Sequence, residues 1–453
     1  MDKKNENVQA SAGLTRRRFL GRGVAASAAA LLADGAAAQT APVPVPVPAP
    51  VPVPVPAMPP APPVVVVDAG TENLPPNVPQ WMKEPGAGFL NPPYGLPSPY
   101  EKGVVRKLPD QPTTFPTATR TPLQSLVGVN TPNGLFFERH HAGVPAIDPA
   151  QHRLMVHGMV RQPLLLTMKD IKRFPSITRS YFIECSGNSI GEFKAPGKGT
   201  VQDIHGLVSC AEWTGVRLSD VLSEVGIDPN AQWILAEGAD AAAMSRSIPI
   251  AKALDDALLV YGQNGEMLRP EQGYPLRLLL PGYEGNMNIK WLRRLKLGDA
   301  PFQTREETSK YTDLMADGYA RQFTFAMGVK SVITSPSAHQ KLEQQGFHEI
   351  TGLAWTGAGH IRRVEVSVDG GLNWQGAVLE EPVMSRALTR FRLRWYWRGE
   401  SAVLQSRAYD EGGNVQPTRG ALIGTDGTKS IYHYNAIQSW KVDTNGEVSN
   451  VHV

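Results

Sequence analysis

The chain has 453 residues, of which 42% are hydrophobic and 19% are charged, and its formal net charge is +3 at pH 7. This composition is close to that of an ordinary soluble protein, and the length predicts two domains with additional flanking segments. A net charge of +3 is too small for the strongly basic surface that nucleic-acid binding requires, so neither DNA nor RNA binding is indicated.

The N-terminus has the pattern of an export signal. Arg16 and Arg17 precede a short, alanine-rich apolar run at residues 24–33, and small residues follow at 36–38. The run is too short to span a membrane, which favours a twin-arginine signal peptide over residues 1–38; an amphipathic N-terminal helix is the alternative. We therefore expect a periplasmic protein without a membrane anchor. Because this route carries folded proteins, it also points to a cofactor inserted in the cytoplasm.

Proline dominates the next two segments. Residues 41–63 consist almost entirely of Pro, Val and Ala, which predicts an extended polyproline spacer over residues 39–67. A docking site for a proline-reading domain is the alternative function of this stretch. In residues 68–122 prolines interrupt short apolar runs, which predicts an irregular arm.

The first folded domain is expected at residues 123–324, where strand and helix patterns are mixed. Apolar alternation predicts strands at 153–158 and 179–185, and a short buried strand lies between Pro275 and Pro281. Helical patterns cover 167–174 and 218–225. The fold class is therefore α+β.

Residues 325–453 show a different pattern, with short strands and regularly spaced turns. Asp369-Gly370-Gly371 is a turn signal between two strands. The sequence predicts a β-sandwich in which the aromatic cluster Trp395–Trp397 packs in the core. Alternating strand patterns occur at 348–355, 361–368, 391–397 and 401–409.

The chain has two cysteines, Cys185 and Cys210, which is too few for a disulfide scaffold. It has no Cys-x-x-Cys-His sequence to attach a haem, so electrons would have to leave through a partner. Cys185 follows a predicted strand and precedes small, turn-forming residues, where a thiol can act as a ligand or nucleophile. From spacing alone, a buried structural cysteine is the alternative. We expect Cys210 to be core, and His205, His348 and His360 lack metal-ligand spacing.

Three segments combine cations with aromatic residues or glycine-rich turns: 136–141, 273–277 and 285–291. Turn backbone amides together with Arg and Lys side chains are suited to binding an anionic phosphate. By themselves, these segments are equally compatible with solvated surface charges.

These motifs, in this order, resemble the sulfite oxidase family of molybdopterin enzymes over nearly all of the chain after the proline-rich spacer. Cys185-Ser-Gly-Asn188 matches the family's Cys-x-Gly-Asn, whose cysteine ligates molybdenum. Further matches are Trp213–Leu222, Ser247–Pro249, Gly273–Arg277 and Lys290–Leu292. The resemblance implies a molybdenum–molybdopterin cofactor, a sulfite-oxidase-like α+β domain, and an immunoglobulin-like dimerisation sandwich.

The resemblance also assigns roles to single residues. Cys185, Arg139 and Tyr311 match catalytic positions, with Cys185 as the metal ligand. Gln272 departs from the histidine that the family often has there. The residues that correspond to cofactor-binding positions are Phe137, Glu138, Arg139, His140, His141, Cys185, Asp240, Gln272, Arg277, Asn288, Ile289 and Lys290.

Two departures concern the substrate. Ile190 occupies the position of an arginine in the sulfite-oxidising branch, and residues 432–435 lack a further substrate arginine expected near Trp440. Loss of guanidinium groups weakens a site for a small dianion. The pattern resembles the sulfane-dehydrogenase branch, which implies oxidation of a sulfane sulfur held on a carrier-protein cysteine in periplasmic thiosulfate oxidation. It also implies electron transfer to a c-type cytochrome subunit, and a homodimer within a heterotetramer.

Three alternatives remain at this point. A sulfite:cytochrome oxidoreductase would act on free sulfite, and an exported molybdoprotein reductase would act on oxidised methionine. A binding or assembly module that kept the fold without the pterin would contain no molybdenum.

Overall fold

The computed structural model describes residues 97–110 and 117–453. The predicted signal peptide (1–38), the proline-rich spacer (39–67) and much of the predicted arm (68–122) lie outside the described residues. The described part of the arm contains η2 (Pro99–Glu101) and the two-residue strand β1 (Thr117–Ala118), which pairs with β2 (Arg139–His140). In the described part of the chain, no helix is both long and apolar enough to cross a membrane.

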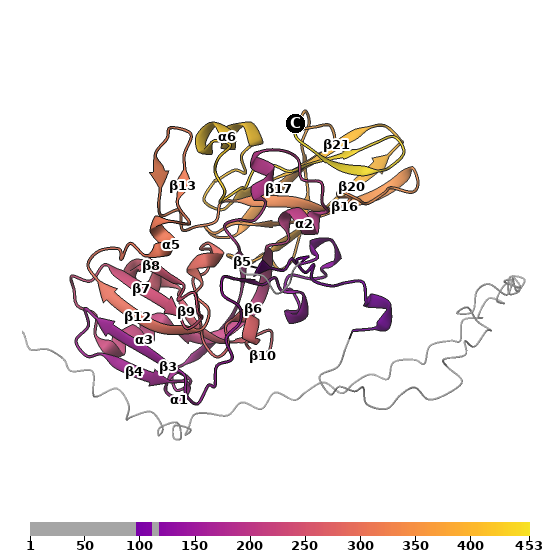
Figure 1. The fold of residues 1–453 in the computed structure, drawn as a ribbon. Coiled ribbons are helices and arrows are strands. Elements are labelled where there is room, and N and C mark those ends of the chain that lie inside the picture. Colours follow the sequence, from indigo (N-terminus) through magenta and orange to yellow (C-terminus); the bar gives the residue numbers. More distant parts are fainter. Residues whose placement is uncertain (1–96, 111–116) are drawn as a thin grey trace, which may run out of the picture. The chain divides into compact units, whose positions relative to one another are not determined.

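The N-terminal lobe, residues 117–324, contains two five-stranded sheets in its described part (Figure 1). Strands β3 and β12 pair in parallel, and the other neighbouring strands of these sheets are antiparallel. In order across the first sheet the strands are β4 (Leu164–Thr167), β3 (Arg153–Gly158), β12 (Leu292–Gly298), β7 (Trp233–Gly238) and β8 (Ser245–Pro249). Those of the second are β10 (Glu266–Met267), β9 (Leu258–Gln263), β6 (Val208–Arg217) and β5 (Ser176–Glu184), and β11 (Arg277–Leu279) also pairs with β9.

Short helices connect these strands. The predicted helix at 218–225 is confirmed, since α3 (Leu218–Val225) buries four apolar residues at i, i+3, i+4 and i+7 and ends at Gly226. The predicted helix at 167–174 is shorter than expected: α1 (Met168–Ile171) begins with a capping box between Thr167 and Asp170. The remaining α-helices of this lobe are α2 (Val201–His205), α4 (Ile250–Asp255) and α5 (Arg305–Thr308). The 3₁₀ helices are η3 (Leu123–Ser125), η4 (Asn133–Leu135), η5 (Ile190–Phe193), η6 (Pro270–Gln272) and η7 (Gly285–Met287).

The strands from β15 to β23 form the C-terminal sandwich, so the predicted order of an α+β domain and a β-sandwich is confirmed. One sheet is β15 (Lys330–Ser335), β16 (Gly346–Trp355), β20 (Thr389–Trp397) and β19 (Val378–Glu380). The other is β18 (Gln375–Gly376), β17 (Ile361–Ser367), β21 (Ala402–Asp410), β22 (Ser439–Val442) and β23 (Val448–Val451). The sequence did not predict α6 (Arg419–Asp426) or the hairpin of β13 (Asp313–Leu314) and β14 (Ala320–Arg321) that precedes the sandwich.

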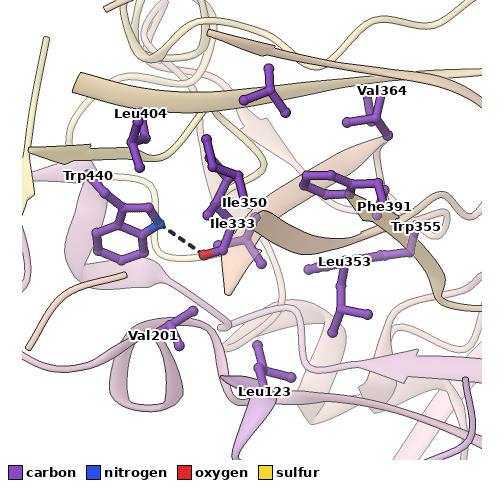
Figure 2. Packing of buried hydrophobic residues seen from close by; sticks show 14 of the residues in the cluster. Leu123, Val201, Ile333, Ile350, Leu353, Trp355, Val364, Phe391, Leu404 and Trp440 are labelled. Atoms are coloured by element: carbon purple, nitrogen blue, oxygen red, sulfur yellow. Dashed lines mark hydrogen bonds between the residues drawn. The ribbon is translucent and has the colours of Figure 1, made fainter. Parts of the chain in front are cut away.

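The sandwich core is built from the inner faces of both sheets (Figure 2). Trp440 is completely buried, and its indole Nε1 donates a hydrogen bond to the carbonyl of Ile333 at 3.0 Å. Leu123 and Val201 of the N-terminal lobe belong to the same apolar cluster, so the core is continuous between the lobes. Cys210 also lies in this cluster, as predicted.

The prediction for Trp395–Trp397 is wrong for one residue. Trp395 and Trp397 are buried, whereas Tyr396 is exposed. The physical reason is the two-residue period of β20, which points alternate side chains to opposite faces of the sheet.

Strand β5 connects this core to the candidate site. Phe182 belongs to the sandwich cluster, whereas its neighbour Ile183 packs in a separate cluster with Phe137 and Trp213. Because side chains alternate along a strand, the end of β5 presents successive residues to two different environments. Cys185 follows directly after this strand.

Candidate active site

The predicted site residues, with one exception, line a single cavity in the N-terminal lobe. Most lie on or beside β2, at the end of β5, and in the segments around η6 and η7, whereas Asp240 follows β7 and Tyr311 follows α5. The structure brings together Phe137, Arg139, His140, His141, Cys185, Asp240, Gln272, Arg277, Asn288, Ile289, Lys290 and Tyr311. We call this space the inner cavity.

Glu138 is the exception, because it does not line the inner cavity. Its carboxylate pairs with Arg106 and lies 3.1 Å from Nε2 of His140. Burial raises the pKa of Glu138, but the hydrogen bond from His140 and the charge of Arg106 lower it below its ordinary value. The side chain of Glu138 thus contacts His140, and its predicted cofactor-binding role stays a prediction.

Two of the cations that line the inner cavity are the buried Arg277 and the half-buried Lys290. Burial lowers the pKa of Arg277 to about 9. Burial also lowers the pKa of Lys290 to about 7, and repulsion from Arg277 adds to the effect. Nε of Arg277 has no hydrogen-bond partner among the described residues. Desolvated cations with a free donor are stabilised by an anion, so the anionic phosphate of a molybdopterin fits beside these two side chains.

Gln272 replaces the expected histidine without leaving a gap. Its Nε2 donates to the carbonyl of Phe137 at 2.9 Å, and its Oε1 accepts from Nη1 of Arg277 at 3.2 Å. Gln272 therefore links the backbone at Phe137 to the guanidinium of Arg277 and orients that guanidinium.

Cys185 also lines the inner cavity. Its backbone N–H donates to the carbonyl of Leu207, and its own carbonyl accepts from the N–H of Asn188, both at 2.9 Å. Burial raises the pKa of the thiol, whereas the charge of Arg139 lowers it. A thiolate at this position needs further positive charge, which a bound metal ion supplies.

Tyr311 and His141 form a hydrogen-bonded pair beside Cys185, with Tyr311 Oη 3.0 Å from His141 Nε2. Burial and the charges of Arg139 and Lys310 lower the pKa of His141 to about 3. The imidazole is therefore neutral at neutral pH. Burial raises the pKa of Tyr311, so the phenol keeps its proton and donates to His141.

Arg246 lies behind Tyr311, with its guanidinium 5.2 Å from the centre of the phenol ring. Arg246 is fully buried between the carboxylates of Glu284 at 3.4 Å and Glu307 at 3.5 Å. Because such a network is rigid when its charges are paired, it holds the ring of Tyr311 in position.

Cys185 also lines a second cavity of about 800 Å³, which we call the outer cavity. Four residues line both cavities: Arg139, His141, Cys185 and Tyr311. These four side chains stand where a cofactor in the inner cavity would meet a substrate in the outer one. Ile190 lines the outer cavity and is 45% exposed.

Sequence reasoning missed several residues of both cavities. Asn286 and Trp291 line the inner cavity and lie within the segment 285–291 that had been singled out, so their segment carried a signal. Ile183 and Met244 also line the inner cavity, and no pattern in the sequence indicated them. The outer cavity is built from distant segments that no local pattern joins, and it includes Thr117, Gly187, Glu192, Lys310, Ile431 and Tyr432.

Two family models match the chain. The model described as "Oxidoreductase molybdopterin binding domain" matches residues 141–306, and "Mo-co oxidoreductase dimerisation domain" matches residues 321–439. Sulfite oxidase of Gallus gallus is 32% identical over 326 residues, covering 65% of this chain and 69% of that protein. Mitochondrial sulfite oxidase of Homo sapiens is 33% identical over 328 residues, covering 65% of this chain but 58% of that protein. The chain thus spans less than two thirds of the human relative.

A solved structure is also similar. The crystal structure of the sulfane dehydrogenase SoxCD from Paracoccus pantotrophus matches with a TM-score of 0.81 and 45% sequence identity. The match covers 83% of this chain and 97% of that one. With relatives of this identity and coverage and with both domain models in the expected order, the chain belongs to the sulfite oxidase family of molybdopterin enzymes.

Proposed function

We propose that this chain is the molybdenum subunit of a sulfane dehydrogenase, which oxidises a sulfane sulfur held on a cysteine of a carrier protein. The observation that carries the proposal is the meeting of the two cavities at Arg139, His141, Cys185 and Tyr311. The inner cavity has the cations of an anion-binding site, and the outer one has room for a protein-borne substrate.

The residues of the inner cavity would hold a molybdenum–molybdopterin cofactor. Cys185 would bind the metal through its thiolate, and Arg277 and Lys290 would bind the phosphate. Phe137, His140, His141, Asp240, Gln272, Asn288 and Ile289 would line the pterin. When bound, this cofactor supplies transfer of an oxygen atom from water to sulfur and accepts the electrons released.

Arg139 and Tyr311 would act on the substrate side. The guanidinium of Arg139 would stabilise the negative charge that develops on the sulfur-bound oxygens. The phenol of Tyr311, oriented by its hydrogen bond to His141, would hold a proton close to the reacting sulfur. His141 accepts this hydrogen bond because its low pKa keeps the imidazole neutral.

The outer cavity supports a carrier-bound substrate. Its volume of about 800 Å³ is far larger than a small oxyanion requires. Ile190 contributes an apolar side chain where the sulfite-oxidising branch has an arginine, so a clamp for a free dianion is incomplete. The similarity to the structure of a sulfane dehydrogenase supports a carrier-bound substrate as well.

The proposal includes a location and partners. The chain would be exported to the periplasm by the twin-arginine pathway and would pass its electrons to a c-type cytochrome subunit. The dimerisation-domain match supports a homodimer, which we place within a heterotetramer that contains two cytochromes.

Replacing the proposed metal ligand tests the first part of the proposal. Cys185→Ser should reduce the molybdenum content of the purified protein and abolish turnover, because an alcohol is a poor ligand for this metal. Molybdenum content can be measured by mass spectrometry of the metal. A variant with normal turnover would refute the assignment of Cys185.

A second candidate function is oxidation of free sulfite to sulfate, which the similarity to sulfite oxidases and the presence of Arg139 favour. Turnover with an artificial electron acceptor separates the two functions. We expect rapid oxidation of a carrier-bound sulfane and slow oxidation of sulfite. The reverse order would favour the sulfite oxidase reading.

A further inference from the structure

The residue before the proposed metal ligand is a fully buried carboxylate. Glu184 is 1% exposed, and the alternation of β5 turns its side chain toward the sandwich, away from the inner cavity that Cys185 lines. Its Oε1 accepts from Nζ of Lys330 at 3.0 Å, and its Oε2 accepts from Nε1 of Trp355 at 2.7 Å. Both donors belong to the C-terminal sandwich, on β15 and β16.

A second contact ties the far end of the Cys185 loop to the same lysine. Nζ of Lys330 also donates to Oγ of Ser189 at 3.1 Å, and Ser189 has a left-handed backbone with φ of 67°. Oγ of Ser189 lies 2.7 Å from Nδ1 of His205, whose Nε2 lies 3.0 Å from Oε1 of Gln438. These contacts are all satisfied if Ser189 donates to Nδ1 and a neutral His205 donates from Nε2 to Gln438.

Asn188 closes the loop between these two anchors. Its Nδ2 donates to Oε1 of Glu184 at 2.9 Å and to the carbonyl of His205 at 3.0 Å. Its Oδ1 accepts from the N–H of Leu207 at 3.2 Å. The loop of residues 185–189 is therefore fixed by a continuous network of hydrogen bonds whose side chains do not line the inner cavity.

We infer that Glu184 and Lys330 are positioning residues, through which the C-terminal sandwich holds the Cys185 loop in the geometry that metal binding requires. The inference rests on the proposed function, in which Cys185 is the metal ligand. Burying a carboxylate and an ammonium is costly, and an apolar pair would often serve stability as well. The charged pair adds a fixed geometry, because Lys330 donates hydrogen bonds to Glu184 at one end of the loop and to Ser189 at the other.

The thiol of Cys185 gives a readout that does not depend on the metal. In the full chain produced without cofactor, iodoacetamide can be used to alkylate the two cysteines, and each modified peptide can be followed by mass spectrometry. Cys210 is completely buried in the apolar core and reports global unfolding. Lys330→Met should raise the alkylation rate of Cys185 by about tenfold, because it shifts the loop toward open conformations, while Cys210 stays protected.

A milder variant keeps the test valid if Lys330→Met fails to fold. Trp355→Phe removes one donor to Glu184 and keeps an aromatic ring in the core, so it should raise the rate for Cys185 in the same direction but less. The double variant Glu184→Gln with Lys330→Met leaves no unpaired buried charge but still lacks the lysine contacts, so Cys185 should keep reacting faster than in the unmodified protein. A return to the unmodified rate would show that an unpaired charge, and not loss of the contacts, opens the loop, and would overturn the inference.

Lys252 provides a matched control. It is also a buried lysine, it pairs with Asp256 at 2.7 Å and it donates to the carbonyl of Pro281, but it lines neither cavity. Lys252→Met should leave the alkylation of Cys185 unchanged. If it accelerates Cys185 as much as Lys330→Met does, or if Lys330→Met and Trp355→Phe both leave Cys185 unchanged, the inference is overturned.

The loaded enzyme gives a second, spectroscopic readout. Lys330→Met should alter the Mo(V) electron paramagnetic resonance spectrum, which reports the geometry of the thiolate ligand, whereas Lys252→Met should not. The two proposals fail separately. Normal molybdenum binding and turnover in Cys185→Ser would refute the assignment of Cys185 as the metal ligand. An unchanged Cys185 alkylation rate in both Lys330→Met and Trp355→Phe would refute only the positioning role of Glu184 and Lys330.

Discussion

Ile190 is the residue at which the choice between sulfite and a protein-borne sulfur can be tested most directly. It lines the outer cavity together with Arg139, so an arginine there would add a second guanidinium to that space. A charge-assisted hydrogen bond contributes about 1.5–3 kcal/mol. We therefore expect Ile190→Arg to lower the KM for free sulfite by about tenfold or more, since ~1.4 kcal/mol corresponds to a factor of ten.

Steady-state oxidation of sulfite with ferricyanide as acceptor would measure this effect. Ile190→Met is the control, because it keeps an apolar side chain of similar size and should leave the KM for sulfite unchanged. Equal KM values for the arginine and methionine variants would show that this position does not determine the substrate.

Tyr311 is placed to act in turnover more than in binding. Tyr311→Phe removes the phenol that donates to Nε2 of His141 and keeps the ring stacked near Arg246. Loss of a positioned proton donor typically costs about 10²-fold or more in rate. We expect kcat to fall by about this factor with little change in KM or molybdenum content. A large rise in KM with normal kcat would instead assign Tyr311 to substrate binding.

At the scale of elements, the approach of η7 to the end of β5 shapes the inner cavity beside Cys185. A Cβ added at Gly285 would lie 2.8 Å from the carbonyl oxygen of Glu184 and 3.2 Å from Cα of Cys185. Both contacts are with backbone, which cannot rotate away. Gly285→Ala should therefore displace the Cys185 loop, destabilise the protein by about 1–3 kcal/mol and reduce its molybdenum content.

Gly424 in α6 is the control for this prediction, because a Cβ there would have no atom within 4 Å. Gly424→Ala should leave both molybdenum content and unfolding midpoint close to those of the unmodified protein. If Gly285→Ala also binds a full complement of molybdenum, the close packing of η7 on β5 is not required for the site.

The elements that sequence predicted best are those with a local signal. The predicted bounds of the strand at 153–158 and of the helix at 218–225 agree with the observed ones, because apolar periodicity and a terminal glycine are local features. The parallel pairing of β3 with β12 joins Met155 to Arg294, and no local pattern predicts a partner so far away in the sequence. Resemblance places the segment 137–141 at the site but does not tell which of its side chains line the cavity, and that of Glu138 does not.

The candidate site shows the same limit. Its inner cavity follows from motifs that lie in a few short segments, so most of its residues were predicted. The outer cavity and the network behind Cys185 depend on tertiary contacts. Lys330 contacts Glu184 across 146 positions of the sequence, and nothing near either residue indicates the other.

At the scale of the whole molecule, the continuity of the core between the two lobes makes stability sensitive to acid. His205 at the end of α2 is fully buried, contacts Gln438 of the sandwich and packs its ring edge-to-face near Trp440. Burial and the charge of Lys330 lower its pKa well below the ordinary value of 6.5. The folded protein thus binds fewer protons than the unfolded chain below pH 6.5. Stability from this group is present above that pH and is lost as pH falls.

We expect the free energy of unfolding to fall with acidification by up to about 1.4 kcal/mol per pH unit from this histidine alone. His205→Gln should be less stable at pH 7, because it loses the contact with Ser189, but its stability should fall less between pH 7 and pH 5. Urea unfolding followed by tryptophan fluorescence at both pH values would measure the two slopes. The remaining buried histidines, such as His152, contribute equally to both proteins, so the difference between the slopes isolates His205. Identical slopes would mean that protonation of His205 does not limit the acid stability of the contact between the lobes.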